Sequence, residues 1–491
     1  MSRCRRVLGF VVGSIALPGA LAAQCDSWLA LGAGTGSWVT ALTTLPNGDV
    51  VAGGTFTTAG GLPVNRIARW DGSTWSPLGS GLQGTTLALT ALPNGDLFAA
   101  GTFTMAGGVP AGRIARWNGA AWSGLAGGFG ADVIALTALP GGDLVAGGHF
   151  ERGSGQWLFH IARWNGSTWS PLGPGLNEDV YALTTLPNGD VVAAGRFVSA
   201  GGVPAQRVAR WDGSTWSALG SGMDNTVQAL TTLPNGDLVA GGWFHVAGGV
   251  PVNYIARWDG TAWSALGTGT NDAVWALATL PNGDLVAGGQ FTAAGGVAAS
   301  RVARWDGSAW SALGTGTDGL VSALTVLPDG DVVAGGQFTT AGGVATANVA
   351  RFDSCLPGYR VFGGGCPGSL GVPGNAALQL PRLGTTMTAQ ITRMPQNAGF
   401  LGLGWSSTMA SVGPLPIELS ALGMPGCSVR VALDHVQFLP GTGLVGTWSL
   451  AIPNQTALLG VVFHSQCLVV DPPVNAFGAT LSDAATAVIG L

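Results

Sequence analysis

The sequence has no lysine and little charge of either sign. Asp, Glu and Arg make up 9% of its 491 residues, compared with about 25% in ordinary soluble proteins. The 20 basic residues are all arginine, they form no cluster, and the formal net charge is −5. Because binding to nucleic acid needs a positive surface that meets the phosphates, we expect no nucleic-acid partner.

Several enzyme motifs are also missing. The sequence contains no GxSxG nucleophile motif and no P-loop, so it shows no sign of the sites that these motifs build. A zinc site of His149, His160 and His245 is conceivable, but these residues lack the HxxxH spacing of many zinc enzymes. We therefore assign no catalytic residue and expect no cofactor and no bound metal.

After the N-terminus there is no apolar run long enough to span a membrane. Within residues 1–23, three Arg precede a short apolar run, which ends in small residues. This pattern predicts a secretory signal peptide cut near Ala22 or Ala23, and therefore a secreted or cell-surface protein. The alternative is a lipid anchor on Cys25, for which Gln24 is a poor preceding residue.

What the sequence has in excess is glycine, with 83 residues, and repetition. The motif Leu-Pro-x-Gly-Asp occurs seven times at a constant step of 47 residues, with no insertion or deletion. Its leucines are Leu45, Leu92, Leu139, Leu186, Leu233, Leu280 and Leu327. A Trp and a Phe recur in each unit with the same step, and we expect both series to form the core.

Each unit is predicted to form four short strands. In the first unit these are residues 39–45, 49–56, 66–70 and 74–79. The turns PNGD and DGS between them accept a positive φ, whereas residues 57–65 are expected to be a looser loop. A repeated four-stranded unit of this length is typical of a propeller blade, so the fold class is all-β, with a seven-bladed β-propeller.

The motifs LVAGG and IARW, followed by a Trp, resemble the kelch repeat and, more closely, the delta-60 type repeat of bacterial propellers. The resemblance covers residues 28–353 and implies a propeller domain at about 24–355, but no function. Within the kelch group, galactose oxidase uses a copper–tyrosyl centre with two Tyr, two His and a Cys linked to Tyr. This chain has three Tyr in all, and its mature cysteines lie outside the upper loops, so we do not expect that chemistry.

The phase of the repeat predicts how the ring closes. Trp28 stands at the position of the fourth strand of a unit, but the first three strands of that unit are missing before it. The seventh unit, in turn, ends after its third strand, at Phe352. The N-terminal strand should therefore complete the last blade. Cys25 and Cys355 would then be adjacent, and we predict a disulfide between them. It would close a long loop, for which chain-entropy arguments give about 4–5 kcal/mol as an upper value.

Two charged positions are identical in all seven units, and we expect each Arg, buried between blades, to bind the Asp of the first turn as structural scaffold. The pairs are Asp49 and Arg69, Asp96 and Arg116, Asp143 and Arg163, Asp190 and Arg210, Asp237 and Arg257, Asp284 and Arg304, and Asp331 and Arg351.

Functional residues are expected on the face that carries the second loops and the blade-linking loops, because these vary while the other turns hardly do. Units three to five gather aromatic and charged residues there that other units lack. The candidate ligand-binding residues are His149, Glu151, Arg152, Trp157, His160, Tyr181, Arg196, Trp243, His245 and Trp275.

Exposed aromatics beside His, Arg and carboxylates suit capture of an extracellular polysaccharide or protein. We therefore predict an exported, non-enzymatic binding or surface-interaction protein, monomeric, that uses this face. The alternatives are a secreted glycan-active enzyme on the same face, a purely structural surface component, or variation that serves no ligand.

Residues 356–365 are Gly-rich and are predicted to be a linker to a β-sandwich at 366–491, where apolar segments alternate with Pro-Gly turns. This region resembles a β-module at the end of secreted repeat proteins of environmental bacteria, whose role is unassigned. The mature chain has five cysteines, an odd number. We predict a Cys366–Cys427 disulfide and a buried free thiol at Cys467; the alternative pairing is Cys366–Cys467.

Overall fold

The structure is a computed structural model. It describes residues 26–354 without a gap and, after them, residues 358–362, 375–379, 385–394, 398–404, 409–410, 413–414, 417–418, 428–429, 435–442, 445–451, 462–470, 479–481 and 484–488. All regular elements in these ranges are β-strands. No helix in the described part of the chain has the length and apolar character of a membrane span.

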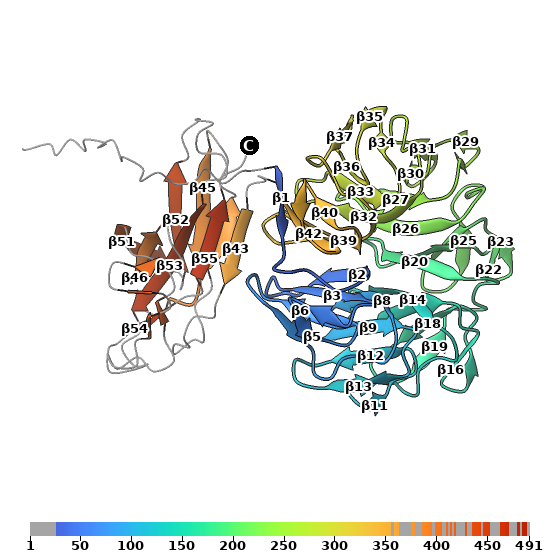
Figure 1. Cartoon of the computed structure of the whole chain (residues 1–491), viewed down its shortest axis with the longest axis horizontal. Coiled ribbons are helices and arrows are strands. Elements are labelled where there is room, and N and C mark those ends of the chain that lie inside the picture. The colour runs from blue at the N-terminus through green and yellow to red at the C-terminus, as the bar shows by residue number, and fades with distance from the viewer. Residues whose placement is uncertain are drawn as a thin grey trace, which may run out of the picture.

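Residues 26–354 form a seven-bladed β-propeller, in which each blade is a four-stranded antiparallel sheet (Figure 1). Blades 1–3 consist of β2 (Val39–Thr44), β3 (Val50–Gly54), β6 (Ile67–Trp70) and β7 (Trp75–Pro77); β8 (Thr86–Ala91), β9 (Leu97–Gly101), β12 (Ile114–Trp117) and β13 (Trp122–Gly124); and β14 (Val133–Ala138), β15 (Leu144–Gly148), β18 (Ile161–Trp164) and β19 (Trp169–Pro171).

The remaining blades repeat this order. Blades 4–7 consist of β20 (Val180–Thr185), β21 (Val191–Gly195), β24 (Val208–Trp211) and β25 (Trp216–Ala218); β26 (Val227–Thr232), β27 (Leu238–Gly242), β30 (Ile255–Trp258) and β31 (Trp263–Ala265); β32 (Val274–Thr279), β33 (Leu285–Gly289), β36 (Val302–Trp305) and β37 (Trp310–Ala312); and β38 (Leu320–Val326), β39 (Val332–Gln337), β42 (Val349–Asp353) and β1 (Ser27–Ala30). The prediction of seven blades is confirmed.

The first strand of every blade lies innermost. Consecutive first strands contact one another around the whole ring, from β2 through β8 and onward to β38, which contacts β2 again. The tight turn behind each of them depends on a glycine: Gly48 has a φ of 87°, and its amide donates to the carbonyl of Leu45 at 2.8 Å. Glycine adopts this left-handed conformation without steric cost.

The core lies between the blades. The repeated phenylalanines, such as Phe56, are at most 2% exposed, and the repeated tryptophans, such as Trp75, are 2–6% exposed. Each of these indoles also donates its Nε1–H to a Leu carbonyl of the preceding blade, as from Trp75 to Leu31 at 2.8 Å. Burial and this hydrogen bond together fix each blade against its neighbour.

The N-terminal strand closes the ring as predicted. In Figure 1, β1 lies beside β42; Trp28 pairs with Phe352 and Ser27 with Asp353. The indole of Trp28 donates to Leu313 of blade 6 at 2.9 Å. Cys25 and Cys355 lie outside the described residues, so their disulfide stays a prediction.

The second loop of each unit is a small hairpin, and the expectation of a loose loop was wrong. The hairpins are β4 (Thr58–Ala59) with β5 (Leu62–Pro63), β10 (Met105–Ala106) with β11 (Val109–Pro110), β16 (Arg152–Gly153) with β17 (Gln156–Trp157), β22 (Ser199–Ala200) with β23 (Val203–Pro204), β28 (Val246–Ala247) with β29 (Val250–Pro251), β34 (Ala293–Ala294) with β35 (Val297–Ala298), and β40 (Thr340–Ala341) with β41 (Val344–Ala345). Gly60 and Gly61, with φ of 58° and 78°, form the tight turn of the first one. A bridge between Thr35 and Ala59 ties it to the blade-linking loop, which places both on one face.

The strands after Ser354 are described individually. They are β43 (Gly358–Phe362), β44 (Asn375–Gln379), β45 (Thr386–Ile391), β46 (Ala398–Gly404), β51 (His435–Thr442), β52 (Val445–Ala451), β53 (Val462–Val470), β54 (Ala479–Leu481) and β55 (Ala484–Val488), with the short pairs β47 (Met409–Ala410) and β48 (Gly413–Pro414), and β49 (Ile417–Glu418) and β50 (Ser428–Val429). The nine longer strands link into one sheet, so the predicted two-sheet sandwich is not shown.

Cys467 lies buried in β53 among Met387, Leu401 and Val469. Burial raises the pKa of its thiol to about 12. Its predicted burial is therefore confirmed, while Cys366 and Cys427 lie outside the described residues.

Candidate functional site

At the ends of the innermost strands, the variable face carries a ring of equivalent positions, which we call the axial mouth. It is defined by the residues at the positions of Thr40, Thr55 and Arg66 in each blade. These positions adjoin: the Arg66 guanidinium donates to the Thr55 carbonyl, and the Thr40 hydroxyl donates to the Thr86 carbonyl of the next blade. Residues far apart in the sequence therefore meet there.

Blades 3 and 4 contribute a polar cluster centred on Asp179. Nε2 of His149 lies 3.6 Å from one carboxylate oxygen, and Nδ1 of His160 lies 3.7 Å from the other. The Tyr181 hydroxyl donates to Asp179 at 3.3 Å, and its ring meets the His149 ring edge-on, with centroids 6.1 Å apart. Three of the ten candidate residues thus surround one carboxylate.

Arg196 extends this cluster into solvent. Burial raises the pKa of Tyr181, and the hydrogen bond to Arg196 opposes that shift. The same hydrogen bond, together with the negative charges of Glu178 and Asp179, raises the pKa of Arg196. Arg196 is an exposed cation at the rim of the mouth, where its guanidinium can donate to a ligand.

Blades 5 and 6 contribute two indoles. Trp243, 36% exposed, packs edge-on against Trp275, with centroids 6.1 Å apart and an interplanar angle of 74°. Trp243 stands at the same repeat position as His149 and Arg196, and Trp275 at that of Tyr181. The aromatic and polar halves of the mouth are therefore presented by equivalent positions of neighbouring blades.

Three polar atoms of the mouth are buried without a hydrogen-bond partner among the described residues. They are Nη1 of Arg207, Oε1 of Gln228 and Nε1 of Trp275, from blades 4, 5 and 6. Several equivalent groups in other blades have partners: the Arg113 guanidinium donates to the Thr102 carbonyl, and the Ser322 hydroxyl donates to the Val39 carbonyl at 2.8 Å. A buried unpaired polar group costs about 1–3 kcal/mol.

The other candidates lie apart from the mouth or turn away from it. The guanidinium of Arg152 lies 3.6 Å from the ring centroid of Trp157, on the blade 3 hairpin. His245 packs on Tyr254 at 4.6 Å between centroids, and Glu151 is exposed next to Arg152. The ten residues therefore form four groups: His149 and His160 with Tyr181 and Arg196, the two indoles, Arg152 with Trp157 and Glu151, and His245.

Sequence reasoning missed Phe159, Arg207, Gln228 and Tyr254. Arg207 and Tyr254 occupy the position of Arg66 and His160, which varies between units and has a positive φ in every blade, from 63° to 74°. That variation was visible in the sequence. The sequence could not show that Gln228 lacks a partner, because this depends on which neighbouring groups come within hydrogen-bond distance.

The three histidines do not form a zinc site. His149 and His160 face Asp179, whereas His245 lies on Tyr254. No group of three or more His, Cys, Asp or Glu among the described residues is placed to hold a metal ion.

The structure brings together all seven repeated Asp and Arg. The N–O distances are 2.5–3.2 Å in blades 1–5, and the pairs of blades 6 and 7 are also in contact. The Arg side chains are 31–49% exposed, so the expectation that they are buried was wrong. They lie at the edge of the blades, and the aspartates are the more buried partners.

Blade 7 departs from this pattern. In five blades an Asn two residues earlier donates to the Asp, as from Asn47 to Asp49 at 2.7 Å. Blade 7 has Asp329 there, and Arg351 binds both Asp329 and Asp331. Burial, together with the negative charge of Asp329, raises the pKa of Asp331 to about 6, against the opposing charge of Arg351.

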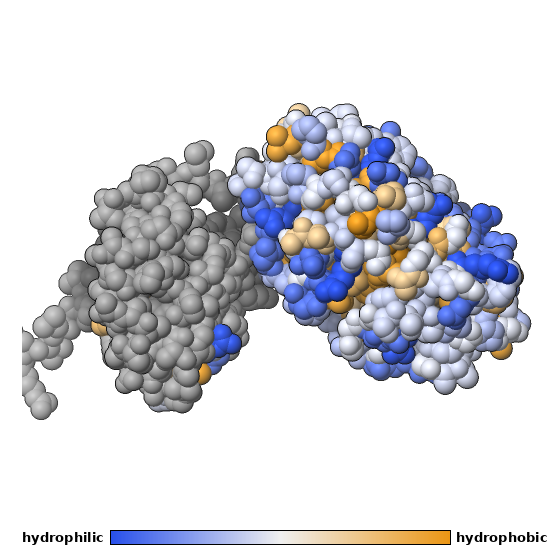
Figure 2. Space-filling view, turned by 90° about the horizontal axis from the view of Figure 1, so that it is seen from below, coloured by the Kyte–Doolittle hydropathy of each residue, from blue (hydrophilic) through white to orange (hydrophobic). Residues whose placement is uncertain are grey.

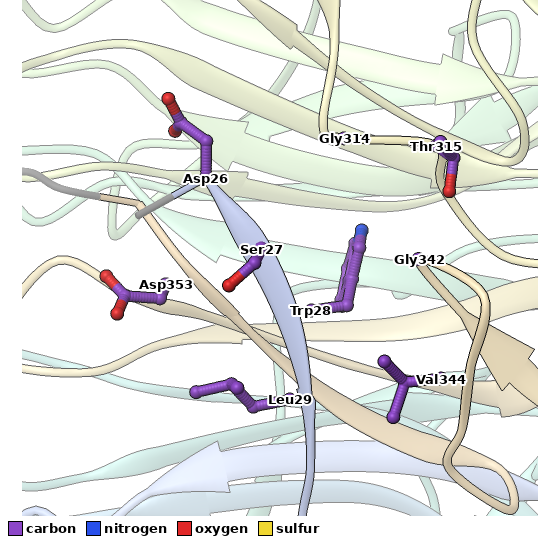
Figure 3. A pocket seen from close by; sticks show the side chains of 9 residues that line it. All are labelled: Asp26, Ser27, Trp28, Leu29, Gly314, Thr315, Gly342, Val344 and Asp353. Carbon is purple, nitrogen blue, oxygen red and sulfur yellow. The ribbon is translucent and has the colours of Figure 1, made fainter. Parts of the chain in front are cut away.

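Blade 7 also has an open groove of about 520 Å³ at the outer edge, beside β1. In Figure 3, Asp26 and Asp353 lie at one end of it, and Trp28 and Val344 line the other. Six blades carry a Trp next to the repeated indole, with centroids 5.2–5.5 Å apart, where blade 7 has Phe352. Blade 7 therefore pairs its repeated indole with a phenyl ring, 5.2 Å away between centroids, instead of with a second indole.

Comparison with known proteins adds a family match. Residues 45–70, 233–258 and 327–354 match a family described as "Domain of unknown function (DUF5122) beta-propeller". No curated protein matched the sequence. The kelch and delta-60 resemblances stay predictions.

Among solved structures, the chain is similar to the extracellular domain of BT4673 from B. thetaiotaomicron, with a TM-score of 0.46 and 10% identity over 74% of this chain and 45% of that one. It is also similar to the WD40 propeller domain of Doa1, with a TM-score of 0.44 and 15% identity over 67% and 95% of the two chains. The chain thus spans less than half of the first of these structures. The seven sheets and the family match identify residues 26–354 as a seven-bladed β-propeller.

Proposed function

We propose that this chain is an exported, non-enzymatic binding protein that holds its ligand at the axial mouth, between blades 3 and 6. The observation that carries the proposal is the row of buried, unpartnered atoms on Arg207, Gln228 and Trp275. Two are donors and one is an acceptor. These atoms are enclosed by protein in the unbound structure, so a ligand that pairs with them, and removes the cost of leaving them unpaired, must displace the groups that cover them.

The surroundings support a polar ligand with an apolar side. Trp243 offers a partly exposed indole, and Arg196 offers exposed donors at the equivalent position of the neighbouring blade. Ligand sites combine apolar aromatic walls with a few fixed polar groups in this way. An extracellular polysaccharide or a peptide has that chemistry, and the predicted signal peptide would bring the protein to either.

The cluster on blades 3 and 4 supports binding without turnover. Asp179 is contacted by His149, His160 and Tyr181, so its carboxylate is engaged within the protein. A general acid or base must instead be presented to the substrate. The cluster serves the proposal by holding Tyr181 and Arg196 in fixed positions.

The test is a binding screen of residues 24–491 against soluble polysaccharides and cell-wall fragments, with Trp243→Ala and His149→Ala alongside. Gln337→Ala is the matched control, because Gln337 stands at the same repeat position on blade 7. We expect at least one ligand whose binding both mouth variants weaken at least tenfold, while the control binds normally and all variants melt alike. Absence of binding, or binding indifferent to both changes, would contradict the proposal.

A further inference from the structure

The hairpin of blade 3 differs in composition from its six equivalents. Where the other blades carry Pro or Ala, it carries Trp157; where they carry small or amide residues, it carries Phe159. The residues at the position of Trp157 are Pro63, Pro110, Pro204, Pro251, Ala298 and Ala345. The fold therefore does not need an aromatic side chain there.

The three large side chains of this hairpin form a stack. The rings of Trp157 and Phe159 are parallel to within 10°, with centroids 5.5 Å apart, which is an offset arrangement. Arg152, paired with Trp157 across the hairpin, places its guanidinium 3.6 Å from the indole centroid. Trp157 is 48% exposed and Phe159 40% exposed, so much of the stack faces solvent.

The backbone holds Phe159 against its conformational preference. Its φ is 45°, and the next residue, His160, has a φ of 70°. A left-handed conformation is unfavourable for a bulky residue. At the position of Phe159 it is shared by Gly112 and Ala347, whereas the positive φ of the following residue recurs in every blade. Strain of this kind accompanies functional positions when the fold itself could avoid it.

We propose that Arg152, Trp157 and Phe159 form a second binding site, which stacks a sugar ring of a glycan chain. The Arg152 guanidinium already covers one face of the Trp157 indole, so the C–H face of a pyranose would stack on the exposed part of the Trp157 and Phe159 rings. Its hydroxyl groups can bind Arg152 and the exposed Glu151 and Gln156. No ligand at the axial mouth is required, so this site stands independently of the proposed function.

Two other classes of partner fit less well. A stable protein interface buries about 1,200–2,000 Å², but the residues between the strands, Ser154 and Gly155, are small or polar, and the rim in Figure 2 mixes small hydrophobic patches with hydrophilic ones. A nucleic acid would need basic residues along its backbone, whereas the net charge is −5.

Trp157 is also away from the mouth, although Phe159 directly precedes His160, one of the mouth residues. The hairpins lie at the outer rim of the propeller in Figure 1, as the labels β11, β16 and β29 show, whereas the mouth surrounds the innermost strands. Variants at the two places can therefore be read separately.

The experiment titrates residues 24–491 with hexasaccharides of glucose, N-acetylglucosamine, mannose and galacturonic acid. The test variant, Trp157→Pro with Phe159→Asn, restores the residues of blades 1 and 5. Trp157→Ala, the residue of blades 6 and 7, is a second variant in case the first folds poorly. Trp243→Ala reports on the mouth.

We expect at least one hexasaccharide to bind the wild type. Its affinity should be at least tenfold lower in both Trp157 variants, and the melting temperature of the double variant should be no lower than that of the wild type. If no hexasaccharide binds, or if the two Trp157 variants bind as tightly as the wild type, the proposal is wrong. Loss of binding in Trp243→Ala alone would assign the sugar to the mouth. This result would overturn the second site and support the proposed function.

Discussion

Replacing Gln228 with Leu should stabilise the propeller and abolish binding at the axial mouth. Oε1 of Gln228 is buried without a partner, and an unsatisfied buried acceptor costs about 1–3 kcal/mol. Leu is close to Gln in size and is the residue that blade 2 has at this position, Leu87. The change therefore removes the unsatisfied group and leaves the packing largely as it is.

The expected gain is about 1 kcal/mol, at the low end of that range because the side chain as a whole is only half-buried. In a domain of this size, 1 kcal/mol corresponds to a rise of about 2 °C in Tm. The assay is thermal unfolding followed by Trp fluorescence, paired with calorimetric titration of whichever ligand the screen identifies.

Ser322→Ala is the matched control, because Ser322 has the same position on blade 7 and its hydroxyl donates to Val39 at 2.8 Å. Removing a satisfied donor should lower stability by about 1 kcal/mol. If Gln228→Leu instead lowers Tm as much as this control does, or leaves binding unchanged, the amide has a partner within the folded protein and the reasoning fails.

Three further predictions concern blade 7. Asp329→Asn should restore the Asn-to-Asp hydrogen bond of five other blades and lower the raised pKa of Asp331. In the wild type, folded Asp331 keeps a proton that the unfolded state loses, so the stability of the wild-type protein should fall as pH rises from about 4 to about 6. The Tm of the variant, measured across the same window, should depend less on pH than that of the wild type. Peptide mapping without reduction should recover Cys25 joined to Cys355, and Cys-to-Ser changes at both should lower Tm; recovery of both as thiols would contradict this. Phe352→Trp should give blade 7 the indole pair of the other six blades and raise Tm by about 1–2 °C; a fall would show that the space beside Trp28 cannot accept an indole.

The sequence was most informative about the propeller, because repetition turns weak local signals into strong ones. One PNGD turn is only a hairpin signal, but seven at a constant step require seven equivalent units, and the phase at Trp28 and Phe352 determined how the ring closes. The hairpins at residues 57–65 and their equivalents were missed because Gly-rich segments carry no apolar alternation, although their backbone groups still pair.

The sequence was less informative about the site, because repeat position gives the blade and the height along its strand but not which side chains touch. His160 joins His149 at Asp179, although Tyr254 has the same repeat position and a similar φ and makes a different contact. His245, at the repeat position of Glu151, packs on Tyr254 instead. Such choices depend on rotamers and on the side chain of the neighbouring blade, and both are settled only in three dimensions.

The most direct test of the account is a crystal structure of residues 24–491 bound to the ligand that binds best in the screen. We predict that the ligand lies in the axial mouth, within hydrogen-bond distance of Arg207, Gln228 and Trp275 and in contact with Trp243. A ligand bound elsewhere, with these three polar atoms satisfied by other protein groups, would contradict the central claim.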